Sequence, residues 1–302
     1  MKKPRHRIWI AGTLGILLGV GFSFGREQDV DLKLAPVAGN VSCLVGRGGN
    51  IGVSAGKDGV LVVDDQFLDL APKIEAELRK LGHGDPLFLV NTHWHGDHTG
   101  GNPHFGKTAV VIAHANARRR LARDASLGGK LSDKELPPAA LPVITYEQGA
   151  SIHFNGEEIR LLHLENAHTD GDTVVWFTGS KVVHMGDLFF QVGYPFIDTE
   201  SGGAVQGLIA GLKAVLAQVP RDARFIAGHG ESTGREGVEE YLAMLETIGE
   251  RVKKGVEEGA SVDDLCAAGV TEDYDARWGN FAFVPARKFV ESLVTCYAKA
   301  KK

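Results

Sequence analysis

The chain has 302 residues, of which 43% are hydrophobic and 24% charged. These values are typical of a globular protein and exclude a disordered, collagen-like or disulfide-scaffold chain. The net charge of −5 argues against a general nucleic-acid binder, which would normally carry a basic face. Histidine is frequent, with 12 residues against 3 cysteines, and the positions of the histidines determine the functional prediction.

Residues 1–25 have the pattern of a secretory signal peptide. Four basic residues precede Ile8–Phe24, an uncharged and mostly apolar run, and Ser23 and Gly25 are small residues suited to cleavage after Gly25. The run is slightly short for a membrane span of about 20 apolar residues, although an uncleaved anchor is the alternative. We therefore expect an exported protein, periplasmic or secreted. Its mature chain would carry 29 basic and 38 acidic residues, because the removed segment holds 4 of the 33 basic residues and no acidic one.

The mature chain alternates between short apolar strands and helices of 3.6-residue period. The first half contains predicted strands at Val41–Val45, Ile51–Ala55, Val60–Val63, Leu87–Val90 and Val110–Ala113, and predicted helices at Ala71–Leu81 and Asn116–Asp124. The second half contains predicted strands at Ser151–Phe154, Glu158–Leu164, Thr173–Phe177, Val182–His184 and Phe225–Ala227, and predicted helices at Ala204–Val219, Glu236–Glu258, Val262–Ala268 and Ala286–Lys299.

The order of these elements repeats in two halves joined near Leu136–Pro142. Asn155-Gly156 between two strands is a strong hairpin signal. Two similar halves predict an α/β (α+β) fold in which two sheets pack face to face with helices outside, in four layers. We expect one domain over residues 26–302, with residues 236–302 as a helical C-terminal extension.

The segment THWHGDH, after the fourth predicted strand, concentrates four potential metal ligands. His93 and His95 are two residues apart, so an extended backbone points them the same way. Gly96 permits a sharp turn that aims Asp97 and His98 at a second point nearby. One metal could not easily take all four ligands from so short a loop, whereas two adjacent metals could. Because chance would produce this pattern in only about one sequence in a thousand, it predicts a two-metal centre.

Three further candidate ligands each follow a predicted strand and stand near glycine. A rigid scaffold commonly presents functional side chains at such positions. These residues are His168, Asp187 and His229.

With these residues in place, the chain resembles the metallo-β-lactamase superfamily of hydrolases over residues 40–235, and the HxHxDH motif at 93–98 is highly specific for it. The resemblance implies an αββα sandwich, here with extra C-terminal helices, and a two-metal site, usually zinc, at the edge of the two sheets. It implies that the first metal is held by His93, His95 and His168. It implies that the second is held by Asp97, His98 and His229, with Asp187 bridging both or binding the second.

Two positions depart from one class of true β-lactamases in this superfamily. Asp187 stands where that class has Cys, as in glyoxalase II-like thioesterases and lactonases. Phe190 stands where that class has a lysine for the substrate carboxylate. Both departures argue against classical β-lactam hydrolysis, although other lactamase branches also lack the Cys.

The predicted activity is hydrolysis of a small carbonyl compound by two Zn²⁺ ions, with iron as the other metal considered. Imidazole and carboxylate ligands suit zinc, which activates water at neutral pH. Asp97 is the predicted catalytic residue, because it can bind a metal and also orient the water or accept its proton. An ester, thioester, lactone or β-lactam would suit the site. The acidic chain predicts no nucleic-acid partner, and no stable membrane partner unless residues 1–25 are retained.

Two other functions are compatible with the scaffold. Persulfide dioxygenases of this superfamily use a single iron held by the equivalents of His93, His95 or His168, and Asp187. Export argues against this alternative, since a thiol-dependent oxygenase belongs with a reducing pool. A non-catalytic binding protein is the third reading, and such members usually lose ligands, whereas here all seven positions are filled.

Several residues remain open between a supporting role and ordinary packing. Asp64 ends a strand where the superfamily commonly has an acidic residue that supports the site loop, and a plain strand-end carboxylate is the alternative. We expect His184 to be a hydrogen-bonded core histidine, and the alternative is that it supports the ligands. The segment 189–196 suggests an apolar pocket wall. The other open positions are Thr169 and Asp172 as orienting residues, Tyr194 and Trp94 as pocket-lining residues, and His104 and His114 as surface or helix-start residues.

The three cysteines are too few and too scattered for a disulfide framework. One alternative is that Cys43, Cys266 and Cys296 are buried free thiols. The other is a Cys266–Cys296 bridge, which an oxidising compartment would permit.

Overall fold

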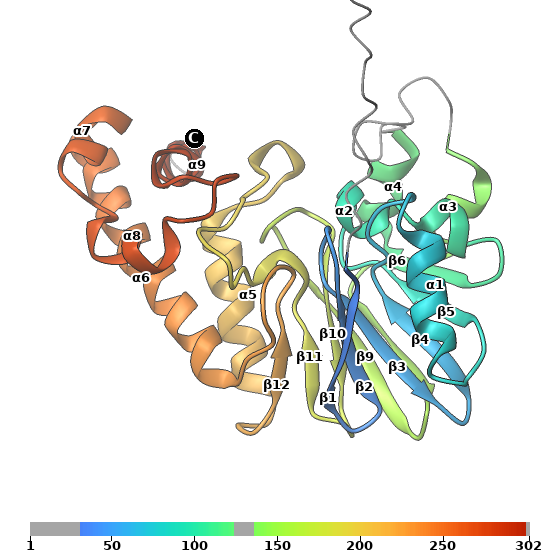
Figure 1. Ribbon diagram of the computed structural model, residues 1–302. Helices are drawn as coiled ribbons and strands as arrows, with labels where there is room; N and C mark the ends of the chain where they lie inside the picture. The colour runs from blue at the N-terminus through green and yellow to red at the C-terminus, as the bar shows by residue number, and fades with distance from the viewer. Residues whose placement is uncertain (1–30, 124–135, 300–302) are drawn as a thin grey trace, which may run out of the picture. The chain divides into compact units, whose positions relative to one another are not determined.

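The computed structural model describes residues 31–123 and 136–299, which form two β-sheets and their flanking helices (Figure 1). The predicted signal segment, residues 1–25, lies outside the described residues, so cleavage and export stay predictions. Within the described ranges no helix combines the length and the apolar character that crossing a bilayer requires.

The first sheet contains seven strands whose spatial order follows their order in the chain. Strands β1 to β4 pair antiparallel, and β4 to β7 pair parallel. Parallel neighbours need a crossover connection, which short helices supply here. The strands are β1 (Lys33–Ala38), β2 (Val41–Val45), β3 (Ile51–Gly56), β4 (Gly59–Val63), β5 (Pro86–Val90), β6 (Val110–His114) and β7 (Ile144–Tyr146). The helices between them are α1 (Ala71–Arg79), α2 (Gly96–Thr99), α3 (Asn102–Phe105), α4 (Ala115–Arg123) and the 3-10 turn η1 (Pro138–Ala140).

The second sheet has five strands in the order β12-β11-β10-β9-β8. The hairpin between β8 and β9 turns on Asn155 and Gly156, whose φ angles of 52° and 83° are the left-handed pair that this tight turn requires. The strands are β8 (Gly149–Phe154), β9 (Glu157–Leu164), β10 (Asp172–Phe177), β11 (Val182–His184) and β12 (Arg224–Ile226). The remaining elements are η2 (Gly186–Leu188), η3 (Thr199–Ser201), α5 (Val205–Gln218), α6 (Arg235–Glu258), α7 (Val262–Ala267), α8 (Glu272–Trp278) and α9 (Ala286–Lys299).

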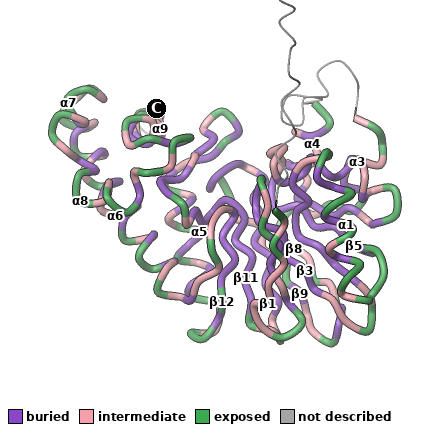
Figure 2. Tube along the Cα trace, viewed as in Figure 1, coloured by how far each residue is buried: buried purple, intermediate pink, exposed green. Residues whose placement is uncertain are grey.

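The inner faces of the two sheets bury one apolar cluster between them. The inner strands β3, β4, β10 and β11 are largely buried, whereas the edge strands β1, β7 and β8 are partly exposed (Figure 2). Val63 and Val90 of the first sheet belong to the same cluster as Val175, Phe177 and Ile226 of the second. Helices α1 to α4 lie on the outer side of the first sheet, and α5, α6 and α9 lie beyond the second (Figure 1). The predicted αββα sandwich with extra C-terminal helices is confirmed.

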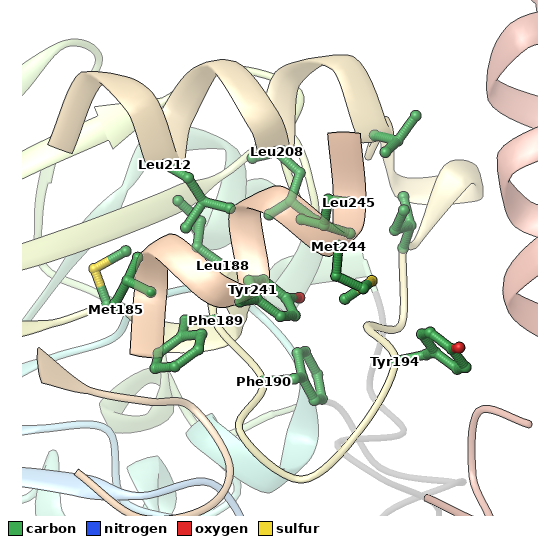
Figure 3. Packing of buried hydrophobic residues seen from close by; sticks show 14 of the residues in the cluster. Met185, Leu188, Phe189, Phe190, Tyr194, Leu208, Leu212, Tyr241, Met244 and Leu245 are labelled. Carbon is green, nitrogen blue, oxygen red and sulfur yellow. The ribbon is translucent and has the colours of Figure 1, made fainter. Parts of the chain in front are cut away.

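The second apolar cluster joins the outer face of the second sheet to the C-terminal helices (Figure 3). Met185 and Leu188, just after β11, share this cluster with Leu212 of α5 and Tyr241 of α6. It continues into α9, where Phe289 is fully buried. The helices after residue 236 therefore share a core with the sandwich and are not a separate appendage.

Three features of the chain differ from the sequence expectation. Strands β1 and β7 and helix α8 have no counterpart among the predicted elements, because none of them has a clear apolar period. The junction of the two halves is wrong at Leu136–Pro142, since β7 still pairs with β6 and the chain enters the second sheet only at β8. His114 directly precedes α4, as the helix-start alternative has it, but it is not a surface residue: it is 4% exposed and its ring stacks on His163 at a centroid distance of 3.7 Å.

The three thiols are free in the structure, and two of them are buried. Burial raises the pKa of Cys43 to about 11, so its thiolate is scarce at neutral pH. Only the partly exposed Cys266 should react quickly with a disulfide reagent such as DTNB in the native protein. All three should react after unfolding in guanidinium without reductant. A single reactive thiol in the unfolded chain would instead support the Cys266–Cys296 bridge.

Candidate metal centre

All seven candidate ligands gather at one edge of the sandwich, in segments that follow strand ends. His93 and His95 follow β5, and Asp97 and His98 begin α2. In the second sheet, the ligands come from the segments after β9, β11 and β12, which run in the same direction. These residues are His168, Asp187 in η2, and His229. The side chains form two groups, each with its ligand atoms within 4.8 Å of one another.

The first group converges three imidazole nitrogens. Nδ1 of His95 lies 3.0 Å from Nε2 of His93 and 2.9 Å from Nε2 of His168. The opposite nitrogen of His168 donates to the carbonyl oxygen of Phe196 at 2.7 Å. That of His95 donates to the Asp198 carboxylate at 3.0 Å. A carbonyl or carboxylate oxygen can only accept, so the nitrogens that face one another carry lone pairs.

The orientation of His93 follows from its neighbour Thr92. The Thr92 hydroxyl donates to Asp64 at 2.7 Å, so it accepts from Nδ1 of His93 at 3.0 Å. Nε2 of His93 is therefore also left with a lone pair. Lone pairs on nitrogens only 2.9 to 3.0 Å apart repel one another, and a bound cation resolves that conflict. The first group therefore has the donor arrangement of a metal site.

The second group consists of Asp97, His98 and His229. Nε2 of His229 lies 3.2 Å from Oδ2 of Asp97 and 3.4 Å from Nε2 of His98. Asp187, which is 5% exposed, completes the first group and also faces the second. Its Oδ2 lies 3.6 Å from Nε2 of His168, and its Oδ1 lies 3.1 Å from Nε2 of His98. Oδ1 is buried, and the ring nitrogens of His98 and His229 face it at 3.1 and 3.5 Å, so this oxygen and both imidazoles point at the same space.

The two groups differ in charge. Burial lowers the pKa of His93 and His168, so both rings are neutral and ready to bind a metal. Burial also opposes charge on His229, but Asp187 and Asp97 outweigh it and raise the pKa of His229 to about 9. Burial would raise the pKa of Asp97, but the imidazoles of His98 and His229 lower it to about 2. A cation bound by the second group would therefore take the place of protons that these imidazoles hold.

Asp64 fixes the loop that carries the first four ligands. It is fully buried at the end of β4, with a left-handed φ of 64°. Its carboxylate accepts from the backbone N–H and hydroxyl of Thr92 and from Nδ1 of His98, each at 2.7 Å. One side chain thus sets the orientation of His93, through Thr92, and of His98 directly. Asp64 is therefore a residue that supports the ligand loop and not a plain strand-end carboxylate.

Close backbone approach shapes the wall of the second group. A Cβ added at Gly228 would lie 2.1 Å from Oδ1 of Asp187. One added at Gly49 would lie 2.1 Å from Cε1 of His98. Any larger residue at either position would displace a candidate ligand, which explains why glycine flanks this part of the site.

The other open residues divide between support and packing. His184 is a buried core histidine whose Nε2 donates to the Asn50 carbonyl at 3.0 Å. Asp172 accepts from the backbone N–H of Thr169 at 2.8 Å and so shapes the His168 loop. Tyr194 is fully buried and does not line a pocket. Its ring stacks on Phe289 of α9 at 4.7 Å.

Trp94 and His104 lie at the periphery of the ligand loop. Trp94 lines a cleft of about 350 Å³ with Arg119, Arg120 and Asp170. His104 is partly exposed in α3, with Nε2 3.4 Å from a carboxylate oxygen of Glu75. Trp94 therefore lines a cleft beside the ligand loop. His104 is a surface residue of a short helix.

Asp198 is a supporting residue that sequence reasoning misses. Its side chain accepts from His95 and from the backbone N–H of Ser201, while its own N–H donates to the His168 carbonyl at 3.0 Å. The one local signal is the helix-capping pattern of Asp198 before Thr-Glu-Ser. That pattern explains the 3-10 turn η3 and reveals nothing about His95, which is 103 residues away.

We expect Asp198→Ala to weaken metal binding by the first group about 10- to 100-fold, because His95 loses the partner that holds its tautomer. Asp198→Asn should lose less, since the amide oxygen still accepts from Nε2 of His95. Zinc affinity would be measured by competition with a chromophoric chelator. Equal affinity in wild type and Asp198→Ala would contradict the supporting role.

The comparisons with known proteins agree with this geometry. A family model described as the metallo-beta-lactamase superfamily matches residues 45–229. An uncharacterized protein of Aquifex aeolicus (strain VF5) is 28% identical over 146 residues, covering 48% of this chain and 68% of that protein. The DIM-1 metallo-beta-lactamase aligns at 20% identity with a TM-score of 0.59, covering 72% of this chain and 99% of that one. The metallo-beta-lactamase from Pontibacter korlensis aligns at 14% identity with the same TM-score and an equal 72% share of this chain, covering 99% of its own. At these identities the likeness to solved structures shows the fold.

Proposed function

Because the chain belongs to the metallo-beta-lactamase superfamily, we propose that it is a zinc-dependent hydrolase that cleaves a small carbonyl compound. The observation that carries the proposal is the pair of ligand groups joined by Asp187. Each group directs its donor atoms at one point, and the buried carboxylate faces both.

Nitrogen and oxygen donors without thiolate suit Zn²⁺. His93, His95 and His168 would hold one ion, and Asp97, His98 and His229 the other, with Asp187 between them. Zinc bound there would supply Lewis acidity, which activates water and polarises a carbonyl group. The set requires neither a serine nor a cysteine nucleophile.

Asp97 is the residue that we assign to proton handling. Its side chain is 31% exposed, whereas those of His98 and Asp187 are 0% and 5% exposed, so Asp97 stands on the open side of the site. In the metal-free chain the imidazoles of His98 and His229 lower the pKa of Asp97 to about 2, and a bound cation in their place would likewise keep the carboxylate ionised at neutral pH. An ionised carboxylate in this position can orient a water molecule and accept its proton as it attacks the carbonyl carbon.

The apolar surroundings support a carbonyl substrate with an apolar portion. The Phe190 ring stacks on His229 at 5.2 Å, where one class of β-lactamases would have a lysine. Esters, thioesters, lactones and β-lactams all remain compatible with the ligand set.

Metal analysis separates this function from iron-dependent oxidation. The purified full chain should contain about two zinc ions per molecule by plasma mass spectrometry, and a chelator should remove its activity reversibly. A panel of nitrocefin, a lactone, a thioester and a phosphodiester, each assayed with added zinc, would then assign the substrate class. One iron per chain, together with oxygen consumption on a persulfide, would overturn the hydrolase proposal.

A further inference from the structure

The segment between α8 and α9 brings two aromatic residues to the metal centre. Phe281 lies 6.2 Å from Phe190, and Phe283 lies 5.5 Å from Phe196, measured between ring centroids. Phe281 and Phe283 also contact one another at 5.9 Å. We call these four residues the aromatic wall.

The aromatic wall is continuous with the candidate ligands of both groups. Phe190 stacks on His229 with an interplanar angle of 22°. Phe196 lies 5.9 Å from both His95 and His168. A molecule that reaches the metal centre across this wall would therefore touch aromatic surface immediately before it meets the ligands.

The outer part of the wall is exposed. Phe283 is 56% exposed, although large apolar side chains are usually covered. An exposed ring beside a polar centre suggests a surface that a ligand covers.

A single cation is held against this exposed surface. The Lys288 ammonium lies 4.2 Å from the Phe283 ring centroid and 5.2 Å from that of Phe196, within the range of cation–π attraction. It donates to the Phe283 carbonyl oxygen at 3.1 Å. No carboxylate of residues 31–123 or 136–299 forms an ion pair with it, whereas its neighbour Arg287 pairs with Asp263 at 2.7 Å. The positive charge of Lys288 is therefore held in place by the aromatic rings and the Phe283 carbonyl, without a carboxylate partner among the described residues.

We propose that the aromatic wall and Lys288 form a subsite for a substrate that carries a carboxylate beside an apolar group. The apolar group lies on Phe281 and Phe283, and the carboxylate accepts hydrogen bonds from the Lys288 ammonium. This inference rests on the proposed hydrolase function and narrows its substrate to anionic carbonyl compounds. Lys288 belongs to α9, outside the residues that the family model matches, so family membership does not predict it.

A single ammonium suits a carboxylate better than a phosphomonoester. A phosphate dianion is usually bound by several donors or by the forked guanidinium of arginine, whereas a lysine acts as one point charge. Since the surface around Lys288 is aromatic, the ligand must also offer apolar area. Both requirements together describe an amphiphilic carboxylate.

Binding of 4-phenylbutyrate and of its uncharged analogue 4-phenylbutanamide tests the subsite without relying on hydrolysis. The full chain, zinc-loaded and also stripped of metal, would be titrated with each compound by calorimetry. We expect wild type to bind the acid at least about tenfold more tightly than the amide in both metal states. Lys288→Met, which keeps the apolar stem, should abolish the preference for the acid. Phe283→Ala should weaken the binding of both compounds. Lys254→Met on the exposed side of α6 is the matched control and should change nothing.

The outcomes separate this inference from the proposed function. A wild type that binds acid and amide equally, or binds neither, overturns the subsite, as does a Lys288→Met variant that retains the preference. If the preference for the acid over the amide disappears when zinc is removed, the carboxylate binds the metal, and the role of Lys288 is overturned. Absence of hydrolysis across the substrate panel would instead overturn the proposed function, whatever the binding titrations show.

Discussion

Replacing Asp97 with alanine should lower kcat/KM about 10³-fold or more while the protein stays folded. The variant loses a candidate ligand of the second group and the carboxylate that would accept the proton of the attacking water, and a positioned acid or base alone contributes about 10²–10⁴-fold. The fold should persist because the side chain is 31% exposed and lies outside both apolar clusters. Steady-state kinetics on the substrate that the panel identifies would measure the loss, with circular dichroism as the test of folding.

His95→Ala should show a similar loss, since it removes the nitrogen at the centre of the first group. Asp222→Ala is the matched control, because Asp222 is an exposed aspartate that pairs with Lys181 at 2.6 Å outside the ligand groups. Wild-type activity in either Asp97→Ala or His95→Ala would refute the two-metal mechanism. An equal loss in Asp222→Ala would show that the assay reports stability and not chemistry.

Asp64→Ala should have the largest effect on stability among the residues around the site. It leaves the N–H and hydroxyl of Thr92 and Nδ1 of His98 without their acceptor in a fully buried position. Breaking a buried, hydrogen-bonded charge pair costs about 3–5 kcal/mol, which is a large share of the stability of a typical domain. Urea unfolding in the presence of a chelator would measure this loss without a contribution from metal.

Asp64→Asn separates charge from shape. The amide keeps the volume and one acceptor oxygen, but its NH₂ group faces either Thr92 or His98, both of which donate. We therefore expect a smaller loss of stability than in Asp64→Ala, together with weaker metal binding by the second group. Unfolding free energies equal to wild type in both variants would contradict the role assigned to Asp64.

The sandwich and its ligand positions are largely predictable from sequence because the relevant signals are local. The apolar run of β5 ends at Val90, three residues before His93, and the Asn155-Gly156 pair favours the two left-handed residues that a tight hairpin requires. His168, Asp187 and His229 each come after a strand end, so parallel strand direction within the second sheet places them at the same edge.

The residues that surround the ligands are not predictable in this way. Asp198 contacts a histidine 103 positions earlier, and Lys288 reaches Phe196 only because α9 packs against α5, α6 and η3. No local pattern contains such pairings. The same reason accounts for the burial of His114, which does precede a helix but is covered because β9 brings His163 against it.

The division of the ligands between the two sheets has a consequence for the order of events during synthesis. Four candidate ligands lie within residues 93–98, whereas the last, His229, is the final residue that the family model matches. A chain emerging from the ribosome would present half a site long before the other half exists, and exposed histidines can capture metal prematurely. Both metal ions can be bound only after the two sheets have packed together. Metal binding would then stabilise the folded chain and would not initiate its folding.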